Sequence, residues 1–261
     1  VAEVAESDLV KLDESGVEYD KFGEVTEEAS FVYGDEIVSM DEALAAWTGT
    51  LEKVFPTRSD VEEREISNKL YDTKDIYICK NKVAKPKVFI PVFPGTNCEY
   101  DSLRAFEAAG AEVETIVFKN RNAQDIRDSV DAFVKGISQS QIIMFPGGFS
   151  AGDEPDGSGK FIASFLRAPA IKDAVHDLLN NRDGLMLGIC NGFQALIKLG
   201  LVPYGEIRDL DAASPTLTHN QIGRHASCMV RTKVVSNLSP WFNNVRPGDV
   251  FTIPISHGEG R

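Results

Sequence analysis

A cysteine with a glycine two residues to either side stands where an apolar segment, GLMLGIC, passes into a helix-forming one, NGFQALIKLG. The Gly188–Cys190–Gly192 spacing is typical of a nucleophile elbow, a strand–turn–helix corner in which larger flanking side chains would collide. Such a corner exposes the sulfur beside the first N–H groups of the helix, which favour a thiolate over a thiol. We therefore predict that Cys190 is a catalytic nucleophile. Three further cysteines lack this setting: Cys79, Cys98 and Cys228.

A histidine and a glutamate two positions apart, His257 and Glu259, follow the apolar run VFTIPI. A thiol nucleophile needs a base, and the base needs a group that orients it. Residues two apart in an extended chain point to the same side. Glu259 could therefore hold the His257 ring in one tautomer while the other ring nitrogen faces Cys190. We predict on this reasoning that Cys190, His257 and Glu259 form one catalytic set.

A pair of glycines, Gly147 and Gly148, follows the apolar run QIIMF and one proline. Consecutive glycines let backbone N–H groups approach a ligand closely. Attack of a thiol on an amide passes through a tetrahedral oxyanion, which needs two donors aimed at one oxygen. We expect one donor from this glycine loop and the other from the backbone N–H of Asn191, directly after the nucleophile.

Apolar runs that alternate with helix-periodic segments predict the scaffold that positions these motifs. The expected strands are KVFIPVFPG, EVETIVF, QIIMFPGG and GLMLGIC. Their near-continuous apolar character suits strands covered on both faces. This alternation predicts an α/β fold with a mostly parallel open sheet and helices on both faces. Active sites of such sheets lie at the carboxyl ends of the strands.

Two details of the scaffold complete this prediction. Asn97 stands where it can cap the helix after the first strand, and Gly110 stands where that helix should end. After Leu201 the pattern changes, and CMVRTKVV and VFTIPIS have the character of strands with no strong helix between them. We expect these two strands to extend or flank the sheet.

The composition is that of a globular chain of 261 residues, with 43% apolar and 26% charged residues. No run approaches the roughly 18 consecutive apolar residues of a membrane span. The formal net charge of −13 excludes binding to nucleic acid by general attraction to phosphate. We therefore expect neither a nucleic-acid nor a membrane partner. Four widely spaced cysteines without a CxxC pair argue against a metal site and favour a reduced, cytoplasmic setting.

The negative charge is concentrated in the first third of the chain. Residues 1–82 contain 21 acidic and 9 basic residues, whereas residues 83–261 are nearly balanced. Within the acidic segment, SFVYGDEIVSM predicts a hairpin with its turn at Gly34-Asp35, and Ser39 is placed to cap a helix. Such a small α+β segment has a thin core. It is either the end of a larger neighbouring domain or a small self-contained appendage.

Longer strings around these motifs resemble a known family. PGGF, GICNGFQ and HGE together match the pattern of the class I glutamine amidotransferases, the triad glutaminases. VFPGTNCEYD, FPGGFSAGDE, LGICNGFQALIKLGLVP and ISHGEGR are similar to the glutaminase domain of phosphoribosylformylglycinamidine synthases. GEVTEE and DEALAAWTGTLEKVFPTRSD resemble the end of the synthetase region before that domain. The resemblance covers most of the chain and implies a flavodoxin-like α/β fold.

The resemblance implies an enzyme that hydrolyses glutamine through a cysteinyl thioester. It passes the ammonia to an ATP-dependent synthetase, which converts formylglycinamide ribonucleotide to the amidine in purine synthesis. Carried over, Cys190 is the nucleophile, His257 the base and Glu259 its orienter. The residues implied in binding L-glutamine or its oxyanion are Gly147, Gly148, Asn191, Gln194 and Asn220. No metal or cofactor is implied for this chain, because ATP and magnesium would be bound by the synthetase domains of the same longer polypeptide.

The sequence departs from the family pattern in two places. Ala151 stands where the family often has an aromatic residue, and the chain ends two residues after Glu259, where the family continues. We therefore expect residues 83–261 to be a glutaminase domain truncated at its C-terminus. Residues 1–82 would be the acidic end of the preceding synthetase region plus a linker. The isolated fragment is expected to be weakly active.

Two other interpretations stay open. An elbow-cysteine hydrolase or glyoxalase-like enzyme of the PfpI type typically has a histidine directly after the cysteine, whereas this chain has Asn191. A catalytically silent assembly fragment would fold but release no ammonia. An assay of ammonia release from glutamine separates these interpretations from a glutaminase.

Overall fold

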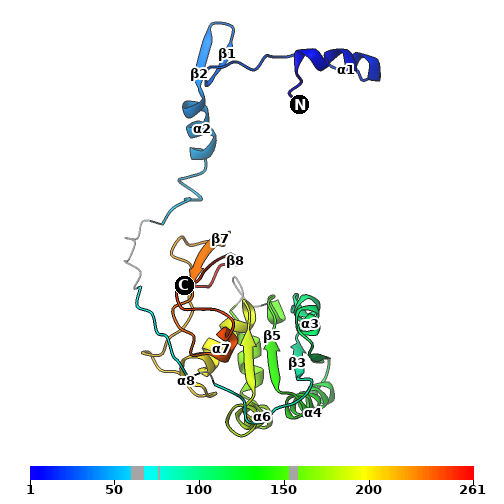
Figure 1. Cartoon of the computed structure of the whole chain (residues 1–261), viewed down its shortest axis with the longest axis vertical. Helices are drawn as coiled ribbons and strands as arrows, with labels where there is room; N and C mark the ends of the chain where they lie inside the picture. The colour runs from blue at the N-terminus through cyan, green and yellow to red at the C-terminus, as the bar shows by residue number, and fades with distance from the viewer. Residues whose placement is uncertain (60–67, 76, 153–157) are drawn as a thin grey trace. The chain divides into compact units, whose positions relative to one another are not determined.

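The computed structural model describes residues 1–59, 68–75, 77–152 and 158–261. Contacts between residues divide the chain into two units, Val1–Ser59 and Asp60–Arg261, which are described separately (Figure 1). The domain boundary expected after residue 82 stays a prediction. No helix in the described ranges is both long enough and apolar enough to cross a membrane.

The first unit contains the predicted hairpin and the predicted capped helix. Its elements are η1 (Glu6–Asp8), α1 (Leu9–Ser15), β1 (Ser30–Tyr33), β2 (Glu36–Ser39) and α2 (Met40–Gly49). The two strands pair antiparallel around the Gly34-Asp35 turn. The Ser39 hydroxyl accepts a hydrogen bond from the backbone N–H of Glu42 at 3.1 Å, which caps α2. No residue of this unit is buried, so its core is thin.

Four strands of the second unit form one parallel sheet. They are β3 (Lys87–Val92), β4 (Glu112–Val117), β5 (Ile142–Phe145) and β6 (Leu185–Gly188), in the spatial order β4-β3-β5-β6. Every pairing in this sheet is parallel, as strand–helix–strand connections produce. The four apolar runs of the sequence are therefore confirmed as strands of a parallel sheet.

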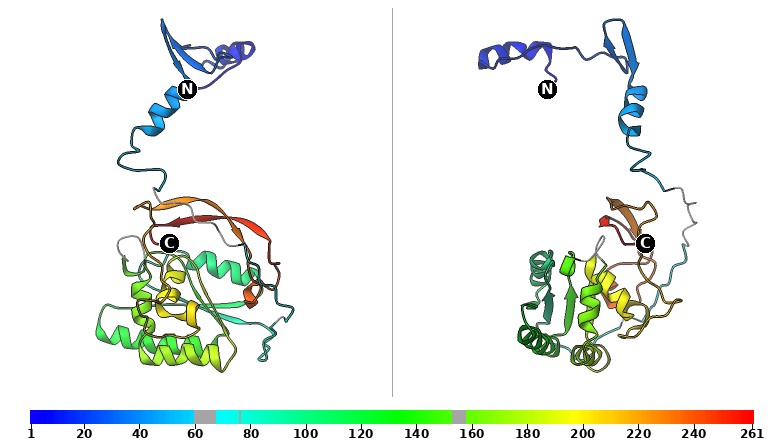
Figure 2. Two further views of the ribbon diagram at one scale, coloured as in Figure 1. Left: turned by 90° about the vertical axis from the view of Figure 1, so that its left-hand side faces the viewer. Right: turned by 180° about the vertical axis from the view of Figure 1, so that it is seen from behind.

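Helices cover both faces of this sheet, as predicted. They are α3 (Glu99–Ala108), α4 (Ala123–Gln139), α5 (Lys160–Leu166), α6 (Pro169–Asn180), α7 (Asn191–Leu199) and α8 (Leu201–Tyr204). One core cluster joins Phe89 of β3 to α4, α5, α6 and α7, and a second joins Val88 and Ile90 to α3. Because successive side chains of a strand alternate between its faces, the two clusters lie on opposite sides of the sheet. Figures 1 and 2 show the helices arranged around this sheet.

The direction in which the helices wind around the sheet changes between β3 and β5. The helix after β3, α3, packs on one face, whereas α5 and α6, which follow β5, pack on the other. Ligands of open α/β sheets bind beyond the carboxyl ends of the strands at such a switch point. The loops after β3, β5 and β6 are therefore where a site is expected.

The helix ends agree with the sequence prediction except at α3. Gly200 ends α7 with a φ of 87°, and Gly110 follows α3 with a φ of 91°. The predicted cap, Asn97, is wrong, because the N-cap of α3 is Cys98 and no side chain caps it. The backbone N–H of Asn97 instead donates to the carbonyl oxygen of Gly147 at 3.1 Å. This hydrogen bond ties the loop after β3 to the loop after β5.

The last two strands form a separate antiparallel ribbon. β7 (Ala226–Lys233) and β8 (Val250–His257) pair along their full lengths, with Ala226 opposite His257. In the part of the chain that the structure describes, neither strand pairs with the four-stranded sheet. Of the two expected arrangements, extension of the sheet is therefore wrong, and flanking of the sheet stays a prediction. The ribbon places His257 at the end of β8.

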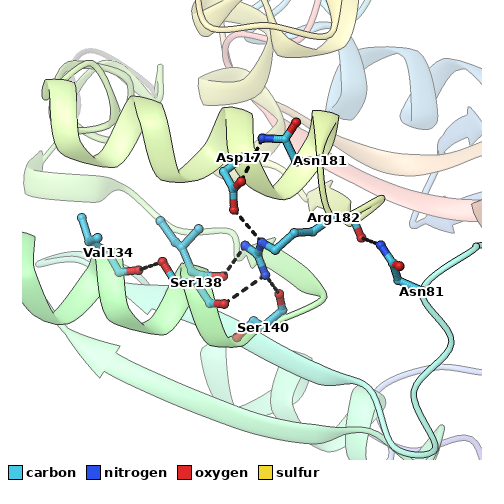
Figure 3. Close-up of polar contacts among 8 residues, drawn as sticks. Asn81, Val134, Ser138, Ser140, Asp177, Asn181 and Arg182 are labelled. Atoms are coloured by element: carbon cyan, nitrogen blue, oxygen red, sulfur yellow. Dashed lines mark hydrogen bonds and ion pairs between the residues drawn. The ribbon is translucent and has the colours of Figure 1, made fainter.

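Arg182, in the turn after α6, ties several segments together (Figure 3). Its guanidinium donates to the backbone carbonyl oxygens of Ile137, Ser138 and Ser140 at 2.9, 3.1 and 2.8 Å. It also donates to the carboxylate of Asp177 at 2.8 Å. A cation at the C-terminus of a helix is favourable because the last carbonyl groups carry partial negative charge. This residue therefore links the end of α4 to α6.

Candidate active site

Cys190 lies at the corner between β6 and α7, in a backbone conformation that non-glycine residues rarely adopt (φ 53°, ψ −111°). It is the N-cap residue of α7 and is exposed. An added Cβ at Gly192 would overlap the carbonyl oxygen of Phe145, and one at Gly188 would come within 2.7 Å of the backbone of Gly192. The corner predicted around Cys190 is present. Gly192 is required by the packing of α7 against β5, and Gly188 by the close approach of α7 to the end of β6.

The loops after β3 and β5 meet beside Cys190. The backbone N–H of Phe149 donates to the carbonyl oxygen of Gly95 at 2.9 Å. A Cβ added to Gly147 would lie only 3.3 Å from the Cβ of Cys190, so the glycine loop contacts the nucleophile. Gly148 has a φ of 128°, and its N–H donates to no other described residue. An N–H in this place can donate a hydrogen bond to the oxygen of a substrate that reacts with the thiol.

Asn191 and Gln194 are buried in the first turns of α7 and are bonded to each other. The side-chain oxygen of Asn191 accepts from the backbone N–H of Ser150 at 3.2 Å, and its Nδ2 donates to Oε1 of Gln194 at 3.1 Å. Nε2 of Gln194 donates to the backbone carbonyl oxygen of Glu259 at 2.7 Å. Gln194, expected at the substrate, thus joins α7 to the segment after β8. Its contact with glutamine stays a prediction.

His257 is half-buried, and its ring is hydrogen-bonded to Asn220. The distance between Nδ1 of His257 and Oδ1 of Asn220 is 2.9 Å. Nδ2 of Asn220 donates to the backbone carbonyl oxygens of His257 and Arg224 at 2.7 and 3.0 Å. Asn220, expected among the glutamine-binding residues, is therefore engaged by the protein, and its binding of glutamine stays a prediction. In the described part of the chain, His257 makes no hydrogen bond to Cys190.

Glu259 is buried in the segment after β8. Its carboxylate forms an ion pair with Lys198 of α7, in which the two side chains are 8% and 17% exposed. Among the described residues, the carboxylate of Glu259 pairs with Lys198 and the His257 ring bonds to Asn220. The role of Glu259 in orienting His257 stays a prediction. The attraction of the Lys198 cation offsets part of the cost of burying the carboxylate.

The segment after β8 is fastened by the loop around Asn220. The backbone N–H of Asn220 donates to the carbonyl oxygen of Gly258 at 2.8 Å. The backbone carbonyl oxygen of Thr218 accepts from the N–H groups of Gly260 and Arg261 at 3.1 and 3.3 Å. The backbone N–H of Thr218 donates to the carbonyl oxygen of Arg261 at 3.1 Å. Together with Gln194 and Lys198, these bonds connect this segment to the helix that begins at Cys190.

Two residues at the site were not predicted from the sequence. Lys198 lies four residues after Gln194, on the same face of α7, and this spacing is the signal that could have identified it. Cys98 has its Sγ 3.4 Å from the position of a Cβ on Gly147. Burial, and then the nearby Cys190, raise the pKa of the Cys98 thiol, which keeps it protonated at neutral pH. Among the described residues, no three His, Cys, Asp or Glu side chains are grouped to hold a metal ion.

One family model and several curated proteins match this chain. Residues 85–261 match the family described as a CobB/CobQ-like glutamine amidotransferase domain. The phosphoribosylformylglycinamidine synthase subunit PurQ of Dehalococcoides mccartyi is 34% identical over 179 residues, which cover 69% of this chain and 64% of that protein. The subunit of the same name from Methanococcus maripaludis is 34% identical over 178 residues, covering 67% and 59%. This chain thus spans less than two thirds of these relatives.

A solved structure is also similar. One chain of the structure of PurLQS from Thermotoga maritima is 29% identical, with a TM-score of 0.49 and 68% of each chain covered.

Proposed function

The chain belongs to the CobB/CobQ-like glutamine amidotransferase family, and on this premise we propose that it hydrolyses the side-chain amide of glutamine. We further propose that the ammonia is used in making formylglycinamidine ribonucleotide from formylglycinamide ribonucleotide, a step of de novo purine biosynthesis. This assignment is supported by the names of the two curated relatives, both of which are subunits of phosphoribosylformylglycinamidine synthase.

The proposed reaction forms a thioester on Cys190. His257 takes the thiol proton, and the sulfur attacks the side-chain carbonyl carbon of glutamine. The tetrahedral intermediate collapses as His257 gives its proton to the departing nitrogen, so that ammonia leaves and a glutamyl thioester stays on the sulfur. Water, losing a proton to His257, then attacks the thioester. Glutamate leaves, and the proton returns to Cys190.

The negative oxygen of each tetrahedral intermediate needs hydrogen-bond donors that are in place before the reaction begins. In this proposal the backbone N–H of Gly148 is one donor and that of Asn191 is the other. The contact between the glycine loop and the Cβ of Cys190 supports the first assignment. The position of Asn191, directly after the nucleophile in the first turn of α7, supports the second.

The observation that carries the proposal is the conformation of Cys190. A non-glycine residue with a positive φ is strained and persists only where its surroundings hold it. Here the surroundings are two close-packed glycines, the start of α7 and the end of β5. The strain turns one thiol outward at the carboxyl end of a parallel sheet, where enzymes of this fold class place their reactive groups.

The binding of ATP and magnesium is assigned to a partner. ATP and magnesium belong to the synthetase that consumes the ammonia, whereas thioester hydrolysis uses only the thiol, the base and the oxyanion donors. The partner would be the synthetase part of the same enzyme. The reaction belongs in the cytoplasm, because a nucleophilic thiol has to stay reduced.

The test is ammonia release from glutamine by the purified chain, alone and with a synthetase partner. We expect equal amounts of ammonia and glutamate, with the activity abolished by Cys190→Ala. Cys228→Ala, which removes an exposed thiol on β7, is the matched control and should leave turnover unchanged. A wild-type chain that releases no more ammonia than Cys190→Ala under both conditions would contradict the proposal and favour a silent assembly fragment. Turnover of other substrates but not of glutamine would favour a PfpI-type enzyme.

A further inference from the structure

Two cysteine sulfurs from different loops approach the same point beside Gly147. A Cβ added to Gly147 would lie 3.4 Å from Sγ of Cys98 and 3.8 Å from Sγ of Cys190. The two sulfurs are therefore within about 7 Å of each other. Because Gly147 has no side chain, position 147 places no atoms between them. Cys190 is the proposed nucleophile, whereas the proposed reaction gives Cys98 no role.

Hydrogen bonds hold the backbones that carry these two sulfurs. The carbonyl oxygen of Cys98 accepts from the backbone N–H and the hydroxyl of Ser102 in α3, at 3.1 and 2.7 Å. The carbonyl oxygen of Cys190 accepts from the backbone N–H of Gln194 in α7, at 3.0 Å. A change of rotamer moves a cysteine sulfur by about 3 Å. Rotation of both side chains can therefore bring the sulfurs together while α3 and α7 stay folded.

The two thiols are not equivalent toward an oxidant. Both residues are exposed, so a small oxidant can reach both. Partial burial of the sulfur, and then the nearby Cys190, raise the pKa of the Cys98 thiol, so little of it is thiolate near neutral pH. Oxidants react with thiolates, and Cys190 is the thiol that is deprotonated in the proposed reaction. We therefore expect an oxidant to react first at Cys190 and only then to involve Cys98.

We propose that Cys98 and Cys190 form a reversible disulfide when the protein meets a peroxide, and that this bond protects the nucleophile while it stops turnover. The bond itself does not depend on any activity, whereas its effect on glutamine hydrolysis rests on the proposed function. Disulfides in reduced compartments are usually transient and serve catalysis or redox sensing. Cys98 is then the resolving thiol of a modification site, and Cys190 is the thiol that is oxidised.

The electrons of this modification balance with peroxide as the oxidant. The Cys190 thiolate attacks one peroxide oxygen, the O–O bond breaks, and a sulfenic acid forms as hydroxide leaves. The Cys98 thiolate attacks the sulfenic sulfur, so that the S–S bond forms, the S–O bond breaks and a second hydroxide leaves. Both hydroxides take up protons, and two electrons have passed from the thiols to the peroxide. A dithiol reductant returns these electrons by thiol–disulfide exchange and is itself oxidised to a disulfide.

The bond can be detected in the wild-type full chain without an assay of activity. The chain is treated with limiting hydrogen peroxide, remaining thiols are blocked with N-ethylmaleimide, and unreduced peptides are analysed by mass spectrometry. We expect one major peptide pair, which joins the segments TNCEY and GICNGF and disappears after dithiothreitol. Unfolding in urea before the peroxide should remove the preference for this pair, because the fold brings the two sulfurs together.

Two variants test the role of the second thiol. In Cys98→Ser the sulfenic acid has no resolving thiol and proceeds to the sulfinic acid, which dithiothreitol does not reduce. After peroxide and then dithiothreitol, the wild type should regain most of its ammonia release. Cys98→Ser should regain at least about fivefold less of its own starting activity. Cys228→Ala removes an exposed thiol on β7 and, as the matched control, should recover as the wild type does.

Thermal unfolding shows whether each variant is folded, and the peptide pair of the wild type decides the proposal if a variant is not. Peroxide that leaves wild-type Cys190 as a sulfinic acid, or joins it first to Cys79 or Cys228, would overturn the inference. Equal recovery of activity in Cys98→Ser and the wild type would overturn it as well. A chain that forms the Cys98–Cys190 pair but releases no ammonia from glutamine would contradict the proposed function and leave the modification site supported.

Discussion

Gly192 has no room for a side chain, because a Cβ there would overlap the carbonyl oxygen of Phe145. Gly192→Ala must therefore push α7 away from β5 and move Cys190 with it. We expect a loss of stability of about 1–3 kcal/mol, as for other overpacked interiors, together with a large loss of glutamine-dependent ammonia release. Thermal unfolding and the ammonia assay measure these effects. Gly49→Ala is the control, since an added Cβ there meets nothing within 4 Å, and a fully active Gly192→Ala would contradict the elbow packing.

Cys98 lies near the nucleophile, yet we expect it to react slowly with electrophiles. Burial raises the pKa of its thiol, so at any given pH it holds less thiolate than an ordinary cysteine does. Its alkylation should therefore be slow near neutral pH and should accelerate only as the pH rises through the raised pKa. Peptide mass spectrometry after limiting iodoacetamide measures this, with Cys228, which is exposed as Cys98 is, as internal control. Faster alkylation of Cys98 than of Cys228 at neutral pH would contradict the expectation.

The residues around Cys190 could be predicted from the sequence because an elbow is local: its nucleophile, glycines and helix start lie within a few positions. The partners of the other site residues could not. Asn220 lies 37 residues from His257, and Lys198 lies 61 residues from Glu259. The packing of the ribbon against α7 decides which side chain contacts the histidine in the structure, and the HGE spacing alone does not indicate that contact.

Among the elements, α4 and α6 depend on Arg182 for their junction (Figure 3). Arg182→Ala removes three hydrogen bonds to the carbonyl oxygens at the end of α4 and one to Asp177. Hydrogen bonds that involve a charged group contribute about 1.5–3 kcal/mol, so we expect a destabilisation of about 2–3 kcal/mol in urea unfolding. Arg182→Lys keeps the charge but lacks the planar fork, and should restore only part of the loss. An Arg182→Ala chain as stable as the wild type would contradict this role.

The first and last residues of α7 could be predicted from its sequence, because apolar periodicity and a terminal glycine define a helix locally. The start of α3 could not. The side chain of Asn97 could cap a helix, but its backbone N–H donates to the carbonyl oxygen of Gly147 in a neighbouring loop. The helix α3 therefore begins only at Glu99. The pairing of β7 with β8 alone was also not predictable, since strand character does not say which strand is the neighbour.

For the whole molecule, the alternation of strands and helices predicted the parallel sheet and its two covered faces. The order β4-β3-β5-β6 depends on which face each crossover takes, and that is a property of the packed chain. This order is what brings Cys98, after β3, beside the Gly147 loop, after β5. The second thiol at the site was therefore outside what the sequence could indicate.

The two units differ in the apolar surface that they bury. Trp47 of α2 is 80% exposed, whereas Val88, Phe89 and Ile90 of β3 are 0% exposed. Segments with few buried contacts open at little cost in free energy. We expect the amides of α2 to exchange with deuterium within seconds in the purified chain, and those of β3 to stay protected for hours. Slow exchange in α2 would mean that its apolar side chains are covered by something that the described contacts do not include.

Cys190 is proposed to form a covalent thioester with the side-chain acyl group of glutamine, and a diazoketone analogue of glutamine can trap the thiol that does so. We expect one adduct, located by mass spectrometry on the GICNGF peptide, competed away by glutamine and absent from Cys190→Ala. An adduct that forms first on Cys79, Cys98 or Cys228, or no adduct on the folded wild-type chain, would contradict it.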